Sequence, residues 1–239
     1  MKRTILSIVV LMAAISAMAQ TWKVVKTDGS VVRFHASLVS YVTVEDDYVD
    51  LGLPSGTLWA TCNVGASSPE EYGDYFAWGE TTTKSTYDGS TYKWSAGSGD
   101  YMTKYCTKST YGTVDNKTEL ELSDDAAYVN WGSNWRMPSE DQLRELINSS
   151  YTTTKWTTQN GVYGRKITSK TNGNSIFLPA AGSRSSSSLS NAGSKGCYWL
   201  RTIYTVQTCA QALYFGSDFI YATGIVRNCG LSVRPVRNQ

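Results

Sequence analysis

The chain has 239 residues, of which 41% are hydrophobic and 18% are charged; this balance allows a packed core and excludes a largely disordered chain. Its formal net charge of +2 is too small to predict binding to nucleic acid or to an anionic membrane surface. The 16 tyrosines and 8 tryptophans, against 5 phenylalanines, are side chains that fill cores and are also enriched at binding surfaces.

The first 19 residues contain the three parts of a secretory signal peptide. Lys2 and Arg3 supply positive charge, residues 5–15 form an apolar run too short to cross a bilayer, and Ala17 and Ala19 form a small-x-small cleavage site. We expect cleavage after Ala19 and an exported protein that is secreted, periplasmic or on the cell surface. A buried N-terminal helix is the alternative. No later stretch is long and apolar enough to predict an integral membrane segment.

A β-hairpin is expected directly after the cleavage site. Residues 22–26 and 31–34 are rich in β-branched side chains and flank the turn dipeptide Asp28-Gly29. An Asp-Gly turn between such runs is a strong hairpin signal.

A domain boundary is expected near Tyr48. Residues 41–44 suggest one more strand, and the acidic residues 45–47 interrupt the pattern. We therefore divide the mature chain into an N-terminal β-hairpin segment, 20–47, and a main domain, 48–239.

The first half of the main domain predicts one strand, a long loop and one helix. Residues 58–64 are expected to form the strand, and the polar, Tyr-rich residues 81–118 a long surface excursion. Ser139 and Gln142 have the spacing of a capping box that begins a helix. Apolar residues follow at helical spacing on one face, and the helix is expected to end at 148–150.

The second half predicts short strands. Residues 166–169 and 175–178 flank Asn172-Gly173 and are expected to form a second hairpin, whereas residues 184–188 are expected to be a low-complexity loop. Further short strands are expected at 198–199, 211–215, 219–221 and 231–236. Short strands with one or two helices and much irregular structure predict the α+β class.

The sequence contains no recognisable catalytic motif, and we expect a protein that is not an enzyme and holds no cofactor or metal. A Ser-His-Asp site would need His35, the only histidine, which lies outside the main domain. The pair Asp124-Asp125 suits the first turn of a helix, with calcium binding as the alternative, and Glu70-Glu71 are expected to be in a first turn too.

The five cysteines cannot all pair within the chain, because their number is odd. They are not spaced as a zinc site. We expect them to be mostly free, and one disulfide among Cys197, Cys209 and Cys229 stays open.

Four sequence blocks carry a resemblance to a known family: 48–60, 72–80, 135–139 and 232–237. They resemble a domain of exported proteins of gut Bacteroidetes and Fibrobacter. The resemblance implies a C-type-lectin-like fold, related to that of formylglycine-generating enzymes. It does not imply sugar binding, because the sugar-binding motifs of calcium-dependent lectins do not occur in this sequence.

The closing segment resembles the variable region of proteins that are targets of diversity-generating retroelements. The resemblance rests on Trp199, the run 212–215, Arg227, Gly230 and the ending 232–236. In such targets a reverse transcriptase miscopies adenines, and Asn codons of the template become codons that end in a pyrimidine. These codons cannot encode Lys, Glu, Gln, Met or Trp. No Lys, Glu or Met occurs from residue 197 to 239, although chance can produce such a short stretch.

The resemblance implies a ligand-binding face on this closing segment. Gln207 and Gln211 are assigned to its fixed frame, because pyrimidine-ending codons do not encode Gln. Tyr204 and Tyr221 are expected to be exposed, whereas Ile225 and Val226 fit a contact patch and a strand core equally well. The predicted ligand-binding residues are Leu200, Arg201, Ile203, Tyr204, Val206, Thr208, Cys209, Phe219, Tyr221, Thr223, Ile225, Val226, Cys229 and Leu231.

These observations predict an exported protein that binds a protein or surface ligand through a diversified C-terminal face. An ordinary exported adhesin or structural domain of the same fold, without diversification, is the first alternative. A formylglycine-generating-like enzyme is the second, although the cysteines of this chain are not in the matching motif.

Overall fold

The computed structural model describes residues 21–25, 31–35 and 48–237. The chain divides into two compact units, Met1–Glu45 and Asp46–Gln239, and each is described by itself. The expected signal peptide, the Asp28-Gly29 turn and the strand at 41–44 lie outside the described residues.

The first unit contains the predicted hairpin strands. β1 (Thr21–Val25) and β2 (Val31–His35) pair antiparallel, with Thr21 opposite His35 and Val25 opposite Val31. Threonine and valine favour extended backbone because branching at Cβ restricts their rotamers. The prediction of two paired strands at these positions is confirmed.

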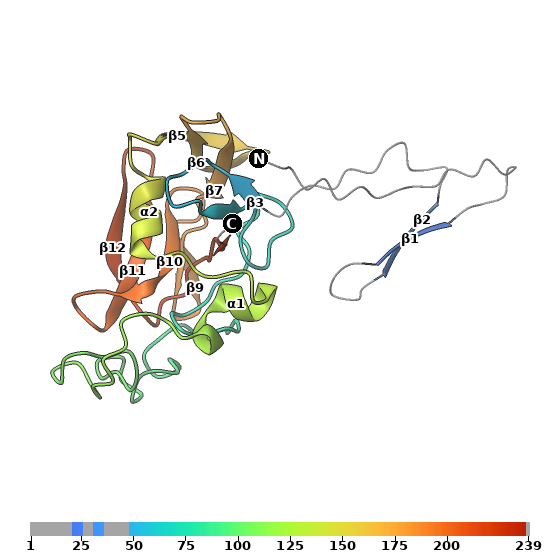
Figure 1. Ribbon diagram of the computed structural model, residues 1–239. Coiled ribbons are helices and arrows are strands. Elements are labelled where there is room, and N and C mark those ends of the chain that lie inside the picture. Colours follow the sequence, from blue (N-terminus) through green and yellow to red (C-terminus); the bar gives the residue numbers. More distant parts are fainter. Residues whose placement is uncertain (1–20, 26–30, 36–47, 238–239) are drawn as a thin grey trace, which may run out of the picture. The chain divides into compact units, whose positions relative to one another are not determined.

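The second unit belongs to the α+β class, as predicted, and over residues 48–237 it consists of small antiparallel sheets with two short α-helices (Figure 1). In spatial strand order, the sheets are β13 (Val236–Arg237), β4 (Leu58–Ala60) and β3 (Tyr48–Asp50); β5 (Thr152–Gln159), β6 (Val162–Ser169) and β7 (Ser175–Pro179); β8 (Ser183–Ser185) and β9 (Ser188–Ser190); β10 (Gly196–Ile203), β11 (Cys209–Phe215) and β12 (Ile220–Val226). No helix in these residues is long and apolar enough to cross a membrane.

Both helices begin at a side-chain cap. α1 (Ala126–Trp131) follows Asp125, whose carboxylate accepts hydrogen bonds from backbone N–H groups of the first turn, so the acidic pair Asp124-Asp125 precedes the helix and does not lie in its first turn as expected. α2 (Glu140–Leu146) follows Ser139, which forms the predicted reciprocal capping box with Gln142. The expectation for Glu70-Glu71 is wrong, because they lie in a turn and Glu71 instead accepts hydrogen bonds from Ser67.

Two short connections join the strands of the sheet β5–β6–β7. Asn160 and Gly161 join β5 to β6 with φ angles of 47° and 82°, and positive φ at both central residues is the type I′ turn that suits hairpins. β6 and β7 pair through Thr168 and Ser175 around Asn172-Gly173, so the second predicted hairpin is confirmed.

Three expected local structures differ in the fold. Strand β4 stops at Ala60, because the carbonyls of Ala60 and Thr61 accept hydrogen bonds from the buried Arg234. Residues 231–236 make no continuous ladder, since their backbone groups pair with several separate segments in turn. Residues 184–188 are not a loop alone but belong to the β8–β9 hairpin.

The excursion 81–118 was expected to lie at the surface because of its polar composition. It also contributes buried side chains to a small hydrophobic core. Tyr87, Tyr92, Met102 and Cys106 are buried there. The hydroxyls of Tyr87 and Tyr92 donate to backbone carbonyls at 2.6 and 2.7 Å. A tyrosine can thus be buried as a core side chain once its polar tip has a partner.

The sheet β10–β11–β12 has hydrophobic core on both faces. Trp199 and Ala212 belong to one cluster, which also holds Trp135 and Met137 from the sequence block 135–139. Leu213 and the facing residues of β10 belong to a second cluster, which includes the apolar side of α2. The sheet is therefore the central layer of the unit, with β12 at its edge (Figure 1).

Candidate ligand-binding surface

The predicted ligand-binding residues lie on β10, β11, β12 and the segments that follow them. Two of them are placed in the core: Leu200 is 1% exposed and Leu231 is 0% exposed. Their side chains contact other core residues and are closed to a ligand at the surface. The expectation for Leu200 and Leu231 is therefore corrected, because both occupy inward positions that the local periodicity of the sequence does not mark.

The remaining residues do not form one continuous face. Tyr221, Thr223 and Ile225 of β12 are opposite Tyr214, Ala212 and Ala210 of β11, whereas Val226 is opposite Cys209. Successive side chains of a strand point to opposite faces of a sheet. The predicted residues on and beside β12 are thus divided into two groups, one on each face of the sheet.

In the first group, Phe219 and Tyr221 form an aromatic surface cluster with Tyr214, which was not among the predicted ligand-binding residues. The ring centroids are 5.0 Å apart for Tyr214 and Phe219, 5.8 Å for Tyr214 and Tyr221, and 5.5 Å for Phe219 and Tyr221. Tyr221 is 46% exposed, as predicted. The ammonium of Lys195 lies 5.6 Å from the Tyr214 ring centroid. The cluster therefore presents aromatic surface beside a positive charge.

The turn that carries Phe219 is held by a buried arginine. Arg165 of β6 donates to the carbonyls of Gly216, Ser217 and Phe219 at 3.0 to 3.1 Å. Its side chain also donates to Thr154. Three hydrogen bonds from one rigid guanidinium fix the β11–β12 turn. The backbone that carries Phe219 is therefore preorganised.

The second group lies around Tyr204, on the other face of β12. A Cβ atom on Gly224 would be 2.3 Å from the Tyr204 ring, so this ring covers the glycine closely. Val206 and Val226 are 43% and 44% exposed. A contact patch and a strand core were both open for Val226 and Ile225. The structure places Val226 at the surface, whereas Ile225 is partly buried against the core.

The two glutamines assigned to the fixed frame are buried and hydrogen-bonded. The Oε1 of Gln207 accepts from the backbone N–H of Thr107 at 2.8 Å, and Gln211 donates to Glu140 at 3.0 Å. Gln207 therefore fastens the β10–β11 turn to the excursion 81–118.

The thiols near this sheet are free in the structure. Burial raises the pKa of Cys197 to about 12, and burial also raises the pKa of Cys209 and of Cys229. These groups are thiols at neutral pH, and a thiol is a poor nucleophile and a poor metal ligand. Within the described residues no group of three or more His, Cys, Asp and Glu is placed to hold a metal ion.

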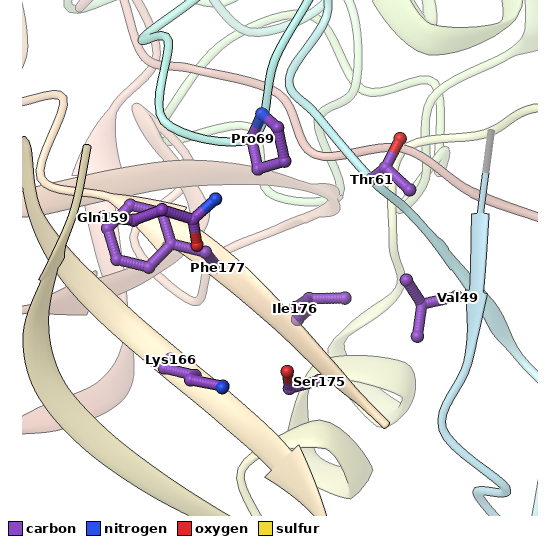
Figure 2. Close-up of a pocket in the computed structure, with 8 residues that line it drawn as sticks. All are labelled: Val49, Thr61, Pro69, Gln159, Lys166, Ser175, Ile176 and Phe177. Atoms are coloured by element: carbon purple, nitrogen blue, oxygen red, sulfur yellow. The ribbon is translucent and has the colours of Figure 1, made fainter. Parts of the chain in front are cut away.

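One pocket lies away from all predicted residues. It has a volume of about 150 Å³ and lies between β3, β6, β7 and the loop after β4. Figure 2 shows the side chains of Val49 and Ile176 on one side and Gln159 and Lys166 from the neighbouring strands. Its lining mixes apolar surface with one amine, one amide and hydroxyl groups, and it includes no carboxylate.

A larger and more polar pocket includes one predicted residue, Arg201. Its volume is about 370 Å³, and its lining residues are Glu119, Ser133, Asn134, Arg136, Gln142, Arg201, Val236 and Arg237. Arg136 and Arg237 lie within the sequence blocks 135–139 and 232–237, on which the family resemblance rests. The signal that could have marked them is the repeated arginine in these blocks, but sequence alone does not place the two blocks beside β10.

Comparisons with protein-family models, curated proteins and solved structures found no match to this chain.

Proposed function

We propose that the protein is an exported ligand-binding protein whose main domain has a C-type-lectin-like fold, and that it is the target of a diversity-generating retroelement. The proposal rests on the sequence blocks described above and on one structural observation. The aromatic surface cluster of Tyr214, Phe219 and Tyr221 lies at the edge of a sheet with core on both faces.

The chemistry of this cluster suits binding of a protein or surface ligand. A few aromatic anchors commonly supply most of the contact energy of an interface. Phe219 and Tyr221 are among the residues that pyrimidine-ending codons encode, whereas Arg165, which holds their turn, lies outside the closing segment. Side chains at the surface can then change while the backbone beneath them is kept.

A randomised library tests the binding face directly. Codons for Tyr204, Phe219, Tyr221 and Thr223 are replaced by mixtures ending in a pyrimidine, and the full chain is displayed and selected on hen lysozyme as an arbitrary probe. We expect most members to fold and some to bind. A matched library at Trp199, Ala210 and Ala212, which are 0% exposed, should give few folded members.

Equal loss of folding in both libraries would show that the surface residues are needed by the scaffold, and the proposed binding face would be wrong. The retroelement is tested separately, by sequencing the DNA around the gene. A reverse transcriptase gene and a near-copy of the 3′ coding region are expected. If both are missing, the protein is an exported adhesin or structural domain without diversification.

A further inference from the structure

The 370 Å³ pocket brings together three arginines from distant parts of the chain. Arg136 precedes α2, Arg201 is on β10 and Arg237 is on β13, so the tertiary fold alone makes this concentration of positive charge. We propose that this pocket binds a small polar ligand through a single carboxylate group. This site is separate from the aromatic surface cluster.

Arg136 is held in place by the cap of α1. Its Nε donates to Asp125 at 2.9 Å, and one Nη donates to the carbonyl of Leu120 at 3.2 Å. Asp125 is 0% exposed and is itself fixed by the backbone N–H groups of Ala127 and Met137. The Arg136 side chain stays 31% exposed, so this rigid support leaves part of it open to the pocket.

Arg201 is also held in place by hydrogen bonds. Its Nε donates to Glu119 at 3.0 Å, and one Nη lies 3.3 Å from both the carbonyl of Met137 and the side-chain oxygen of Gln142. Its backbone N–H donates to the carbonyl of Pro138. The second Nη makes no hydrogen bond to the described residues, and this donor is available to a ligand.

Arg237 is the least neutralised of the three. Its guanidinium carbon lies 4.4 Å from the ring centroid of Tyr48 and 5.7 Å from that of Trp135. No carboxylate of residues 48–237 forms an ion pair with it. Two aromatic rings therefore position this charge, and its N–H donors stay unused within the described part of the chain.

The balance of charge indicates the kind of anion. Three guanidinium groups face two carboxylates, Glu119 in the lining and the buried Asp125, so one positive charge is left over. One excess charge matches one carboxylate better than a doubly charged phosphate. An arginine fork donates two parallel hydrogen bonds to a carboxylate. The side chains of Ser133 and Asn134 supply further hydrogen-bonding groups for the polar body of the ligand.

Titration of the full chain with four defined probes tests the proposal. Galacturonate is a sugar acid, N-acetylglycine has a peptide-like carboxylate, galactose is the neutral control and inorganic phosphate is the competing anion. Binding is measured by ligand-observed NMR and by calorimetry. We expect at least one of the two carboxylates to bind with saturation, and the one that binds more tightly identifies the sugar or peptide source.

Arg237→Gln is the decisive variant, because the side chain has no hydrogen-bonded structural partner in the described residues. Loss of one charged hydrogen-bonding group is expected to weaken carboxylate binding roughly 10- to 100-fold. Arg144→Gln is the matched control, since it removes the same charge from a side chain that is 66% exposed on α2 and outside the pocket. The carboxylate affinity of the Arg144→Gln variant should equal that of the parent protein.

Four results would each overturn the proposal: no saturable binding of either carboxylate, equal binding of galactose, equal effects of the two variants, or phosphate binding tighter than both carboxylates. None of these results depends on the display libraries, so the carboxylate site and the proposed binding face can fail independently.

Discussion

Arg227 offers the sharpest test of how the excursion 81–118 is fastened to the central sheet. Its side chain is 0% exposed and follows directly after β12. The guanidinium donates to the carbonyls of Tyr105 at 2.7 Å and Lys104 at 3.1 Å, and its carbon lies 4.7 Å from the Trp78 ring centroid. We predict that Arg227→Met destabilises the main domain and loosens the excursion.

The expected magnitude follows from these contacts. Each buried carbonyl that loses its partner costs about 1–3 kcal/mol. Arg227→Met leaves two such carbonyls, because the third acceptor of Arg227, the carbonyl of Cys209, also accepts from the backbone N–H of Tyr204. Relief of the cost of burying the charge offsets part of this loss. We expect a decrease of about 2–5 kcal/mol in the free energy of unfolding, which for a domain of this size lowers Tm by roughly 5–15 °C.

Calorimetry and hydrogen exchange measure the two parts of this prediction. Calorimetry should give the lower Tm, and amide exchange should rise first in the residues around Lys104 and Tyr105. Arg144→Met is the control, because its exposed ion pair contributes at most about 0.5–1 kcal/mol. A Tm within about 2 °C of the parent, or exchange that rises evenly over the domain, would refute the reasoning.

Three further predictions concern the scaffold. Ser139→Ala removes the capping box and should cost about 1 kcal/mol, measured by urea unfolding, whereas the exposed Ser150→Ala should cost nothing measurable. Gly196→Ala places a Cβ 2.0 Å from the Phe215 ring and should cost about 1–3 kcal/mol through overpacking; an unchanged urea midpoint would contradict this close approach. Burial alone would raise the pKa of Asp124, but hydrogen bonds from Lys104 and Tyr105 outweigh it and hold this pKa below its ordinary value. The stabilisation is therefore complete above the unfolded pKa and is lost as the pH falls through the folded pKa. Asp124→Asn should make urea stability less dependent on pH below about pH 4, and an unaltered pH slope would argue against this role.

Local signals predicted the elements that depend on neighbouring residues. The capping box at Ser139 and the turn at Asn172-Gly173 formed as expected, whereas Asp125 precedes its helix as the cap and is not in the first turn. Strand β5 was not among the expected strands, although Asn160-Gly161 is an equally strong hairpin signal after the threonine-rich residues 152–158. Such features follow from short-range sterics and hydrogen bonds, which a sequence pattern records.

The candidate site was predicted less completely, because its residues come from separate segments of the chain that only the fold brings together. Tyr221 was expected at the surface and is there, but Tyr204 is only partly exposed, and Leu200 and Leu231 are in the core. In strands with core on both faces, polarity does not alternate with burial. The pattern of β10 and β12 therefore could not separate surface positions from core positions.

The sequence by itself determined the α+β class, two of the hairpins and the capping box of α2. Only the tertiary structure decided that Tyr214 joins Phe219 and Tyr221, and that Arg136, Arg201 and Arg237 surround one pocket. The physical reason is distance along the chain. Local backbone preferences act over a few residues, whereas a surface cluster or a pocket is made where packing of the core brings separate segments together.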